Sequence, residues 1–214
     1  YIFGWLPTRE GDKDEGNWQW GGNLVVHEVL QRPDGSLTVR MPDAVATAFQ
    51  EPASLAPKPI LGDWCVDFDT AYAGALGRFS ALALGELPAE CLLDATVTYQ
   101  PGTYACGLFL RADASLDSYY LARLEPANQR LVIDRWPRPG DQPFVLERPV
   151  AMQANRPIRL RLLVDGTCLV VYVDDSVALC CRLYDHCSGG WGLFAVEGQV
   201  HWSELACKTR ALRA

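Results

Sequence analysis

The chain has 214 residues, 49% of them hydrophobic and 21% charged, which is the composition of a folded globular protein and excludes a disordered one. Its formal net charge of -7 excludes a nucleic-acid partner, because phosphate binding needs clustered Lys and Arg. The longest apolar run, 168–173, has the length of a strand and not of a membrane-spanning helix, so we expect no membrane partner.

Three strands are predicted near the start of the chain. An aromatic and β-branched pattern covers Tyr1 to Pro7. Two further β-rich runs, Asn23 to Leu30 and Leu37 to Arg40, flank Pro33-Asp-Gly35. Because Pro-Asp-Gly between two such runs is a turn signal, these runs are expected to form a hairpin.

These strands predict an incomplete sheet. A strand pattern begins at Tyr1 with no initiator Met or signal peptide before it, so we expect the chain to be part of a larger protein. A small open sheet leaves one face bare, and another segment must therefore cover Trp5, Trp18 and Trp20. No targeting signal is present, which leaves the compartment open.

A short helix and a linker are predicted next. The helix is expected over 42–51, about two turns, because Asp43 can cap its start and Pro52 stops it. The proline-rich stretch from Pro52 to Pro59 is typical of a linker. We therefore expect three parts, with boundaries at 1–42, 43–62 and 63–214.

The third part has the pattern of an antiparallel β-sandwich. Its strand patterns are short, hardly a helix stands between them, and Asp165-Gly166 is the tightest hairpin signal. This spacing of strands and turns predicts an all-β fold of two packed sheets. The predicted strands are 64–68, 79–84, 91–99, 104–111, 119–124, 130–136, 158–164, 168–173, 178–183, 192–196 and 200–207.

The cysteines are expected to be mostly buried free thiols. There are 8, and most fall inside apolar strand patterns, where a thiol behaves as a small hydrophobe. Cys180, Cys181, His186 and Cys187 raise the idea of zinc, but adjacent residues of a strand point to opposite faces and do not easily share one ion. We therefore predict no metal site and no cofactor. A disulfide from Cys187 to Cys180 or Cys181 stays open.

Other polar residues are given structural roles. Asp12, Asp14 and Glu15 stand among Gly and Lys and predict a solvated loop, with contact to a substrate or partner as the alternative. His27, His186 and His201 do not stand with a Ser or Cys in a motif for nucleophilic catalysis, and we interpret them as structural. Glu90-Cys91 lies at the start of a predicted strand, so we interpret Glu90 as an edge residue beside a core cysteine.

Several motifs carry a family resemblance. At the front these are Phe3-Gly-Trp5, Trp18-Gln-Trp-Gly-Gly22, Val26-His-Glu28 and Pro33-Asp-Gly35-Ser-Leu37 followed by Pro42. They resemble the last blade of the five-bladed propeller of glycoside hydrolase family 32, which includes invertases, levanases and inulinases. Residues 161–175, 182–184 and 191–194 are similar to the C-terminal sandwich of that family, although Leu169 and Val170 stand where the family usually has Glu. The segments 106–111, 119–120 and 130–133 also resemble concanavalin-like and laminin-G-like jelly rolls.

The resemblance implies a non-catalytic role for this chain. In the family, three propeller carboxylates act on fructose-containing sugars, two of them in Asn-Asp-Pro and Arg-Asp-Pro motifs and one in a Glu-Cys motif. The chain contains neither of the first two motifs, and its Glu90-Cys91 belongs to the predicted sandwich. We therefore expect a C-terminal accessory portion with a structural role, whose partner is the catalytic propeller of the same protein. Whether any enzyme activity resides in the chain is left open.

An independent lectin-like sandwich is the alternative, with an oligosaccharide or polysaccharide as partner. Flat aromatic rings stack on sugar rings, and the candidate carbohydrate-binding residues are Trp136, Trp18 and Trp20. Trp191 and Trp202 are expected in the core. The two hypotheses differ in whether residues 1–42 add strands to the sandwich or present a separate, Trp-rich sheet.

Overall fold

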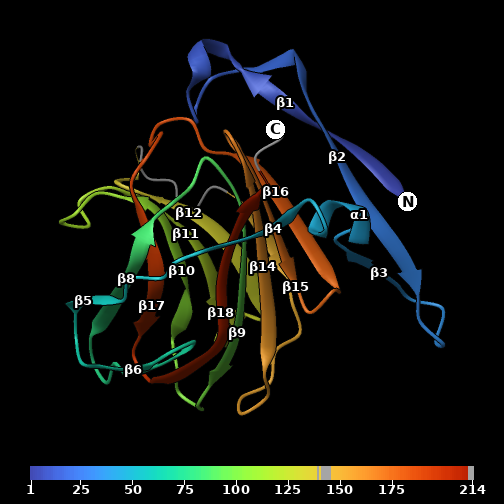
Figure 1. Cartoon of the computed structure of the whole chain (residues 1–214). Coiled ribbons are helices and arrows are strands. Elements are labelled where there is room, and N and C mark those ends of the chain that lie inside the picture. The colour runs from blue at the N-terminus through green and yellow to red at the C-terminus, as the bar shows by residue number, and fades with distance from the viewer. Residues whose placement is uncertain (139, 141–145, 212–214) are drawn as a thin grey trace.

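The computed structural model describes residues 1–138, 140 and 146–211. Figure 1 shows two packed antiparallel sheets, with a separate small sheet at one end of them. The small sheet has the order β1-β2-β3, where β1 is Ile2–Arg9, β2 is Trp18–Gln31 and β3 is Leu37–Arg40. The all-β fold with a sandwich, a few preceding strands and one short helix is as predicted.

The first sheet of the sandwich has seven strands, in the order β13-β12-β11-β10-β17-β8-β5. All of its neighbouring strands are antiparallel. Its strands are β5 Lys58–Leu61, β8 Phe79–Glu86, β10 Ala105–Ala112, β11 Tyr119–Glu125, β12 Arg130–Trp136, β13 Leu146–Pro149 and β17 Gly190–Val196.

The second sheet has eight strands, seven of them in the order β16-β15-β14-β9-β18-β7-β6, while β4 pairs with β18 beside that path. The Asp165-Gly166 hairpin joins β14 to β15 as predicted. The strands of this second sheet are β4 Phe49–Ala53, β6 Trp64–Asp67, β7 Thr70–Gly74, β9 Glu90–Tyr99, β14 Ile158–Asp165, β15 Cys168–Val173, β16 Val177–Arg182 and β18 Gln199–Arg210.

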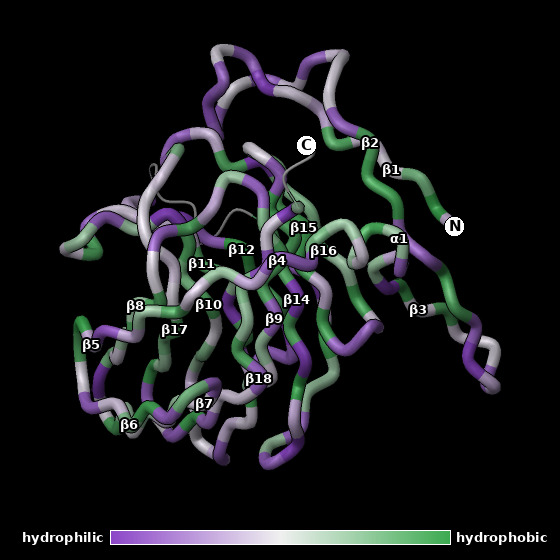
Figure 2. Tube along the Cα trace, in the orientation of Figure 1, coloured by the Kyte–Doolittle hydropathy of each residue, from purple (hydrophilic) through white to green (hydrophobic). Residues whose placement is uncertain are grey.

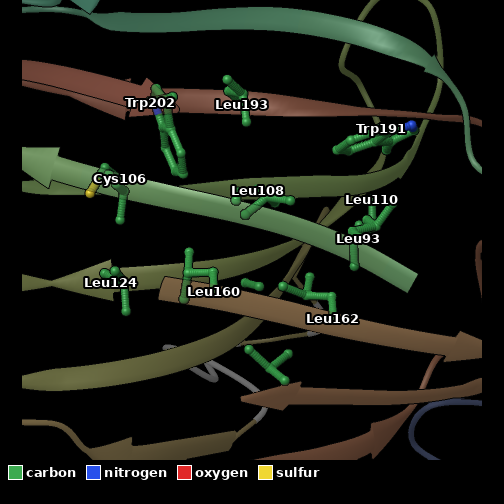
Figure 3. Packing of buried hydrophobic residues seen from close by; sticks show 14 of the residues in the cluster. Leu93, Cys106, Leu108, Leu110, Leu124, Leu160, Leu162, Trp191, Leu193 and Trp202 are labelled. Carbon is green, nitrogen blue, oxygen red and sulfur yellow. The ribbon is translucent and has the colours of Figure 1, made fainter. Parts of the chain in front are cut away.

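The core lies between these two sheets. Along β14, buried residues alternate with more exposed ones, and the hydropathy colours of Figure 2 alternate in the same way along several strands. Figure 3 shows Trp191, Leu193 and Leu108 of the seven-stranded sheet together with Trp202 and Leu160 of the eight-stranded sheet in this core. Trp191 and Trp202 are almost fully buried, which confirms their predicted core positions.

The predicted helix is wrong in length. Only Asp43–Ala46 is helical, as α1, and the side chain of Asp43 does not cap it, because Pro42 occupies the cap position. The rest of the predicted helix continues into β4, where Phe49 is 2% exposed and β4 pairs with β18. Burial of the Phe49 ring and the backbone hydrogen bonds of β4 outweigh the helical propensity of the alanines.

The proline-rich stretch after α1 also differs from a free linker. Its two ends form β4 and β5, which pair with β18 and β8, one in each sheet of the sandwich. Both strands lie at sheet positions where the missing N–H of proline is tolerated. The stretch is therefore held on the sandwich, whereas the division of the chain into three domains stays a prediction.

Two short 3-10 turns complete the described structure. The first, Glu10–Asp12, lies in the loop between β1 and β2, and the second, Pro126–Asn128, joins β11 to β12. The predicted hairpin between β2 and β3 is confirmed, with the Arg32 N–H donating to the carbonyl of Ser36 over 2.8 Å. Gly35 has a φ of +85 in this turn, a value that favours glycine.

Candidate functional site

One face of the small N-terminal sheet is aromatic and exposed. The register of β1 and β2 places Phe3 opposite Val26 and Trp5 opposite Leu24, so these side chains share a face. Trp20 stacks on Trp5 with 5.5 Å between ring centroids and 13° between ring planes. We call Phe3, Trp5, Trp20 and Leu24 the aromatic face, and all four are exposed, Trp20 to 96%. Figure 1 shows β1 and β2 reaching beyond the sandwich.

The opposite face of this sheet packs on the sandwich. Leu6 and Val25 are buried there against Val170 and Tyr172 of β15. The Tyr172 hydroxyl lies 2.9 Å from Nδ1 of His27, and burial lowers the pKa of that histidine. His27 is thus part of the packing, as its structural interpretation predicted.

Arg182 of β16 joins the N-terminal sheet to the sandwich through hydrogen bonds. Its guanidinium donates to the carbonyl oxygens of Leu6 and Pro7 and to the amide oxygen of Asn23, the last over 2.7 Å. The N-terminal sheet and the sandwich are therefore joined by directed polar contacts as well as by apolar packing.

The loop between β1 and β2 inserts a carboxylate into the sandwich. The side chain of Asp14 is 7% exposed and pairs with Arg135. It also accepts hydrogen bonds from the Tyr120 hydroxyl over 2.5 Å and from the Tyr184 N–H over 2.7 Å. Burial and this contact raise the pKa of Tyr120. We call these four residues the Asp14 anchor.

The prediction of a solvated acidic loop is therefore wrong for Asp14. Asp12 and Glu15 are exposed, as predicted, but Glu15 still pairs with Arg135 over 3.2 Å. Arg135 also contacts the carboxylate of Asp185. The sequence did not indicate this because Asp14 and Arg135 are separated by 121 residues.

The three predicted carbohydrate-binding tryptophans do not lie in one site. Trp136, 47% exposed, lines a cavity of about 220 Å³ on the outward side of the seven-stranded sheet. Trp18 lines a different cavity of about 360 Å³, between β1 and β16, and the guanidinium of Arg9 lies 5.6 Å from its ring centroid. Trp20 belongs to the aromatic face.

The polar residues beside Trp136 were missed by the sequence analysis. Arg123, Asp134 and Arg138 line the same cavity together with Tyr104. For Arg123 and Asp134 the available signal was the alternation of side chains along β11 and β12, which placed them on the outward face without showing that they meet. Arg138 lies beyond the end of β12 and had no such signal.

The remaining candidate residues have structural partners. Glu90 pairs with Arg210 over 3.2 Å at the start of β9, and Cys91 beside it is buried, as predicted. All eight cysteines are free thiols, of which Cys65 and Cys187 are exposed. Among residues 1–138, 140 and 146–211, no three His, Cys, Asp or Glu side chains are grouped to hold a metal ion. In the same part of the chain, no helix has the length and apolar character needed to span a membrane.

Known structures share this fold. The carbohydrate-binding module CBM66 from Bacillus subtilis superposes with a TM-score of 0.64 at 15% identity, over 75% of this chain and 99% of that module. A β-fructofuranosidase from Aspergillus kawachii gives 0.60 at 12% identity, over 99% of this chain and 36% of the enzyme. An exo-inulinase from Aspergillus awamori gives 0.57 at 15% identity, over 90% of this chain and 36% of that enzyme.

The chain thus spans about a third of these two enzymes and nearly the whole of the binding module. The comparison with curated protein sequences finds no match. The family model for the C-terminal region of glycosyl hydrolases family 32 matches residues 77–209, which is more than half of the sequence and contains most of the sandwich. The chain therefore belongs to the C-terminal β-sandwich family of the family 32 glycosyl hydrolases.

Proposed function

We propose that the chain is the non-catalytic C-terminal portion of a family 32-like glycoside hydrolase that acts on fructose-containing sugars. In this arrangement the sandwich is an accessory, structural part, and its partner is the catalytic propeller of the same protein. The observation that carries the proposal is the aromatic face, a group of large apolar side chains on a sheet that adds no strand to the sandwich.

Two features of the small sheet support a propeller as the partner. Propeller blades are four-stranded sheets, and β1-β2-β3 supplies three strands, with β1 at an edge. A contiguous exposed apolar patch marks an interaction surface, and Phe3, Trp5 and Leu24 form such a patch beside that edge. A fourth strand and a neighbouring blade would cover both.

The chemistry of the chain supports an accessory role. Hydrolysis by the retaining mechanism needs two carboxyl groups about 5–5.5 Å apart across the glycosidic bond. Glu90, which is part of the Glu-Cys dipeptide, instead pairs with Arg210 on the sandwich. Asp134 pairs with Arg123, and Glu125 pairs with Arg130. We therefore expect the chain alone to hydrolyse nothing.

The test compares residues 1–214 with the complete polypeptide encoded by the same gene. Both are assayed for release of fructose from sucrose, inulin and levan. The proposal expects release by the complete polypeptide and none by residues 1–214. Release by residues 1–214 alone, or a complete polypeptide that lacks the Asn-Asp-Pro and Arg-Asp-Pro motifs, would contradict it.

Carbohydrate binding by the sandwich is a second candidate function. It is supported by the shared fold with a carbohydrate-binding module over nearly the whole of that module. It is also supported by the cavity beside Trp136, where exposed aromatic rings and charged side chains converge. The two functions are compatible, because the cavity and the aromatic face are formed by different sheets.

A further inference from the structure

The cavity beside Trp136 has an apolar floor. Phe194 of β17 lines it and stacks on Phe79 of β8, with 5.8 Å between ring centroids and 18° between ring planes. A Cβ atom at Gly107 would lie 3.0 Å from the Phe194 ring and would collide with the carbonyl oxygen of Ala122. Because position 107 carries no side chain, the ring of Phe194 can lie close to the sheet.

Aromatic side chains form part of the wall. Trp136, at the end of β12, and Tyr104, just before β10, are 47% and 56% exposed. Tyr119, opposite Trp136 in the β11–β12 pairing, is half-buried, and burial raises the pKa of its hydroxyl. These rings offer flat apolar surfaces with polar hydroxyl tips at one small cavity.

Fixed charges form the rest of the wall. Nη1 of Arg123 lies 2.9 Å from Asp134, and its Nε lies 2.8 Å from Glu125. Nη2 of Arg138 lies 2.6 Å from the same oxygen of Asp134. The side chains of Asp134 and Glu125 are 4% and 5% exposed, so these two carboxylates are protected from water, while the Arg138 side chain is 36% exposed.

The charged groups that line the cavity are paired with one another or with neighbouring residues. Burial would raise the pKa of Glu125, but hydrogen bonds from Asn128 and Arg130 and the charge of Arg123 outweigh it and lower that pKa. Three arginines line the cavity together with Asp134, and each of them is paired with a carboxylate. Arg123 pairs with Glu125 and Asp134, Arg138 pairs with Asp134, and Arg135 pairs with Asp14 and Asp185. Among the described residues, the buried Nε of Arg123 forms no hydrogen bond, although it lies 2.8 Å from Glu125.

We propose that Trp136, Tyr104, Arg123, Asp134 and Arg138 form a binding site for one neutral sugar ring. Sugar rings have an apolar C–H face and adjacent hydroxyl groups, which fit an aromatic surface beside fixed donors and acceptors. Since each arginine that lines the cavity is already paired with a carboxylate, the site favours an uncharged ligand over a phosphorylated or acidic one. A cavity of about 220 Å³ has room for a single ring and not for a long chain segment. This inference rests on the second proposed function and identifies its site.

The experiment measures binding of neutral oligosaccharides to the full chain by isothermal titration calorimetry. The probes are inulin, levan, cellulose and mannan oligosaccharides of three to five units, with oligogalacturonate as the acidic probe. Trp136→Ala removes an aromatic surface, and Arg138→Gln removes one donor while Asp134 keeps its pair with Arg123. Trp20→Ala is the matched control, because Trp20 is also exposed but lies on the aromatic face.

Binding of at least one neutral probe is expected, with the affinity lowered about tenfold or more by Trp136→Ala and by Arg138→Gln and unchanged by Trp20→Ala. Circular dichroism checks that each variant is folded. If Trp20→Ala lost binding while Trp136→Ala bound as tightly as the parent chain, the assignment of the site would be overturned, and carbohydrate binding would stand. Binding of the acidic probe alone would overturn the ligand class. Failure of every probe, neutral and acidic, to bind the parent chain would overturn both this inference and the second proposed function.

Discussion

Replacing Asp14 by Asn tests how the N-terminal sheet is joined to the sandwich. The carboxylate accepts hydrogen bonds from Tyr120 and Tyr184 and pairs with Arg135, while its side chain is only 7% exposed. Asn keeps one oxygen acceptor but turns an N–H group toward Tyr120 or Arg135. One charge-assisted hydrogen bond, worth about 1.5–3 kcal/mol, is lost, and one buried donor left without a partner costs about 1–3 kcal/mol.

A loss of about 3 kcal/mol in the free energy of unfolding is therefore expected for Asp14→Asn. For a domain of this size, 1 kcal/mol changes the Tm by about 2–4 °C, so the Tm should fall by about 6–12 °C. Circular dichroism during thermal and urea unfolding measures both quantities. Asp12→Asn is the control, because it removes the same charge from an exposed position of the same loop. Ordinary surface substitutions change the free energy of unfolding by up to about 0.5 kcal/mol. If the two variants differed by less than this, the stabilising role of the Asp14 anchor would be refuted.

Three further predictions concern the sandwich. Trp202→Ala should lower the free energy of unfolding by about 3–5 kcal/mol, and Trp202→Phe by less, because the indole N–H of Trp202 is buried without a partner among the described residues. Urea unfolding followed by circular dichroism measures both variants, and equal losses of unfolding free energy in Trp202→Ala and Trp202→Phe would contradict this prediction. The pKa of Asp113 should be about 2, lowered mainly by a hydrogen bond from Ser118, and carboxylate NMR titration measures it. Its folded pKa lies below the unfolded value near 4, so its contribution to stability is present above about pH 4 and is lost as the pH falls toward about 2; a titration midpoint near 4 would refute this. Cys65 and Cys187 should react with a thiol reagent in the native protein, while the five buried cysteines, Cys91, Cys106, Cys168, Cys181 and Cys207, react only after unfolding; native labelling of a buried cysteine, detected by mass spectrometry, would count against it.

The strands of the fold were predictable where their apolar pattern was long. Residues 130–136 and 168–173 form β12 and β15 with the predicted bounds, because alternation or a continuous apolar run is a strong local signal. Strands β4, β5, β7 and β13 were missed. Each has four or five residues, and β4, β5 and β13 contain proline, so their formation depends on pairing with distant strands and not on their own sequence.

The candidate sites show the same limit. The exposure of Trp136 followed from its position between Arg135 and Pro137 in the sequence. The partners of Trp136 did not, because Tyr104 reaches the cavity from another strand connection and Arg138 from beyond β12. The role of Asp14 was hidden for the same reason, since Tyr120 is 106 residues away. Local patterns indicate which face a residue occupies, whereas the fold determines which residues meet there.

The covering of the aromatic face by a propeller is tested most directly by tryptophan oxidation footprinting. The reactivity of each Trp is measured by mass spectrometry in residues 1–214 and in the complete polypeptide encoded by the same gene. The account predicts that Trp5 and Trp20 react in residues 1–214 and are protected in the complete polypeptide, while exposed Trp136 reacts in both and buried Trp202 in neither. Equal reactivity of Trp5 and Trp20 in the two proteins would contradict it.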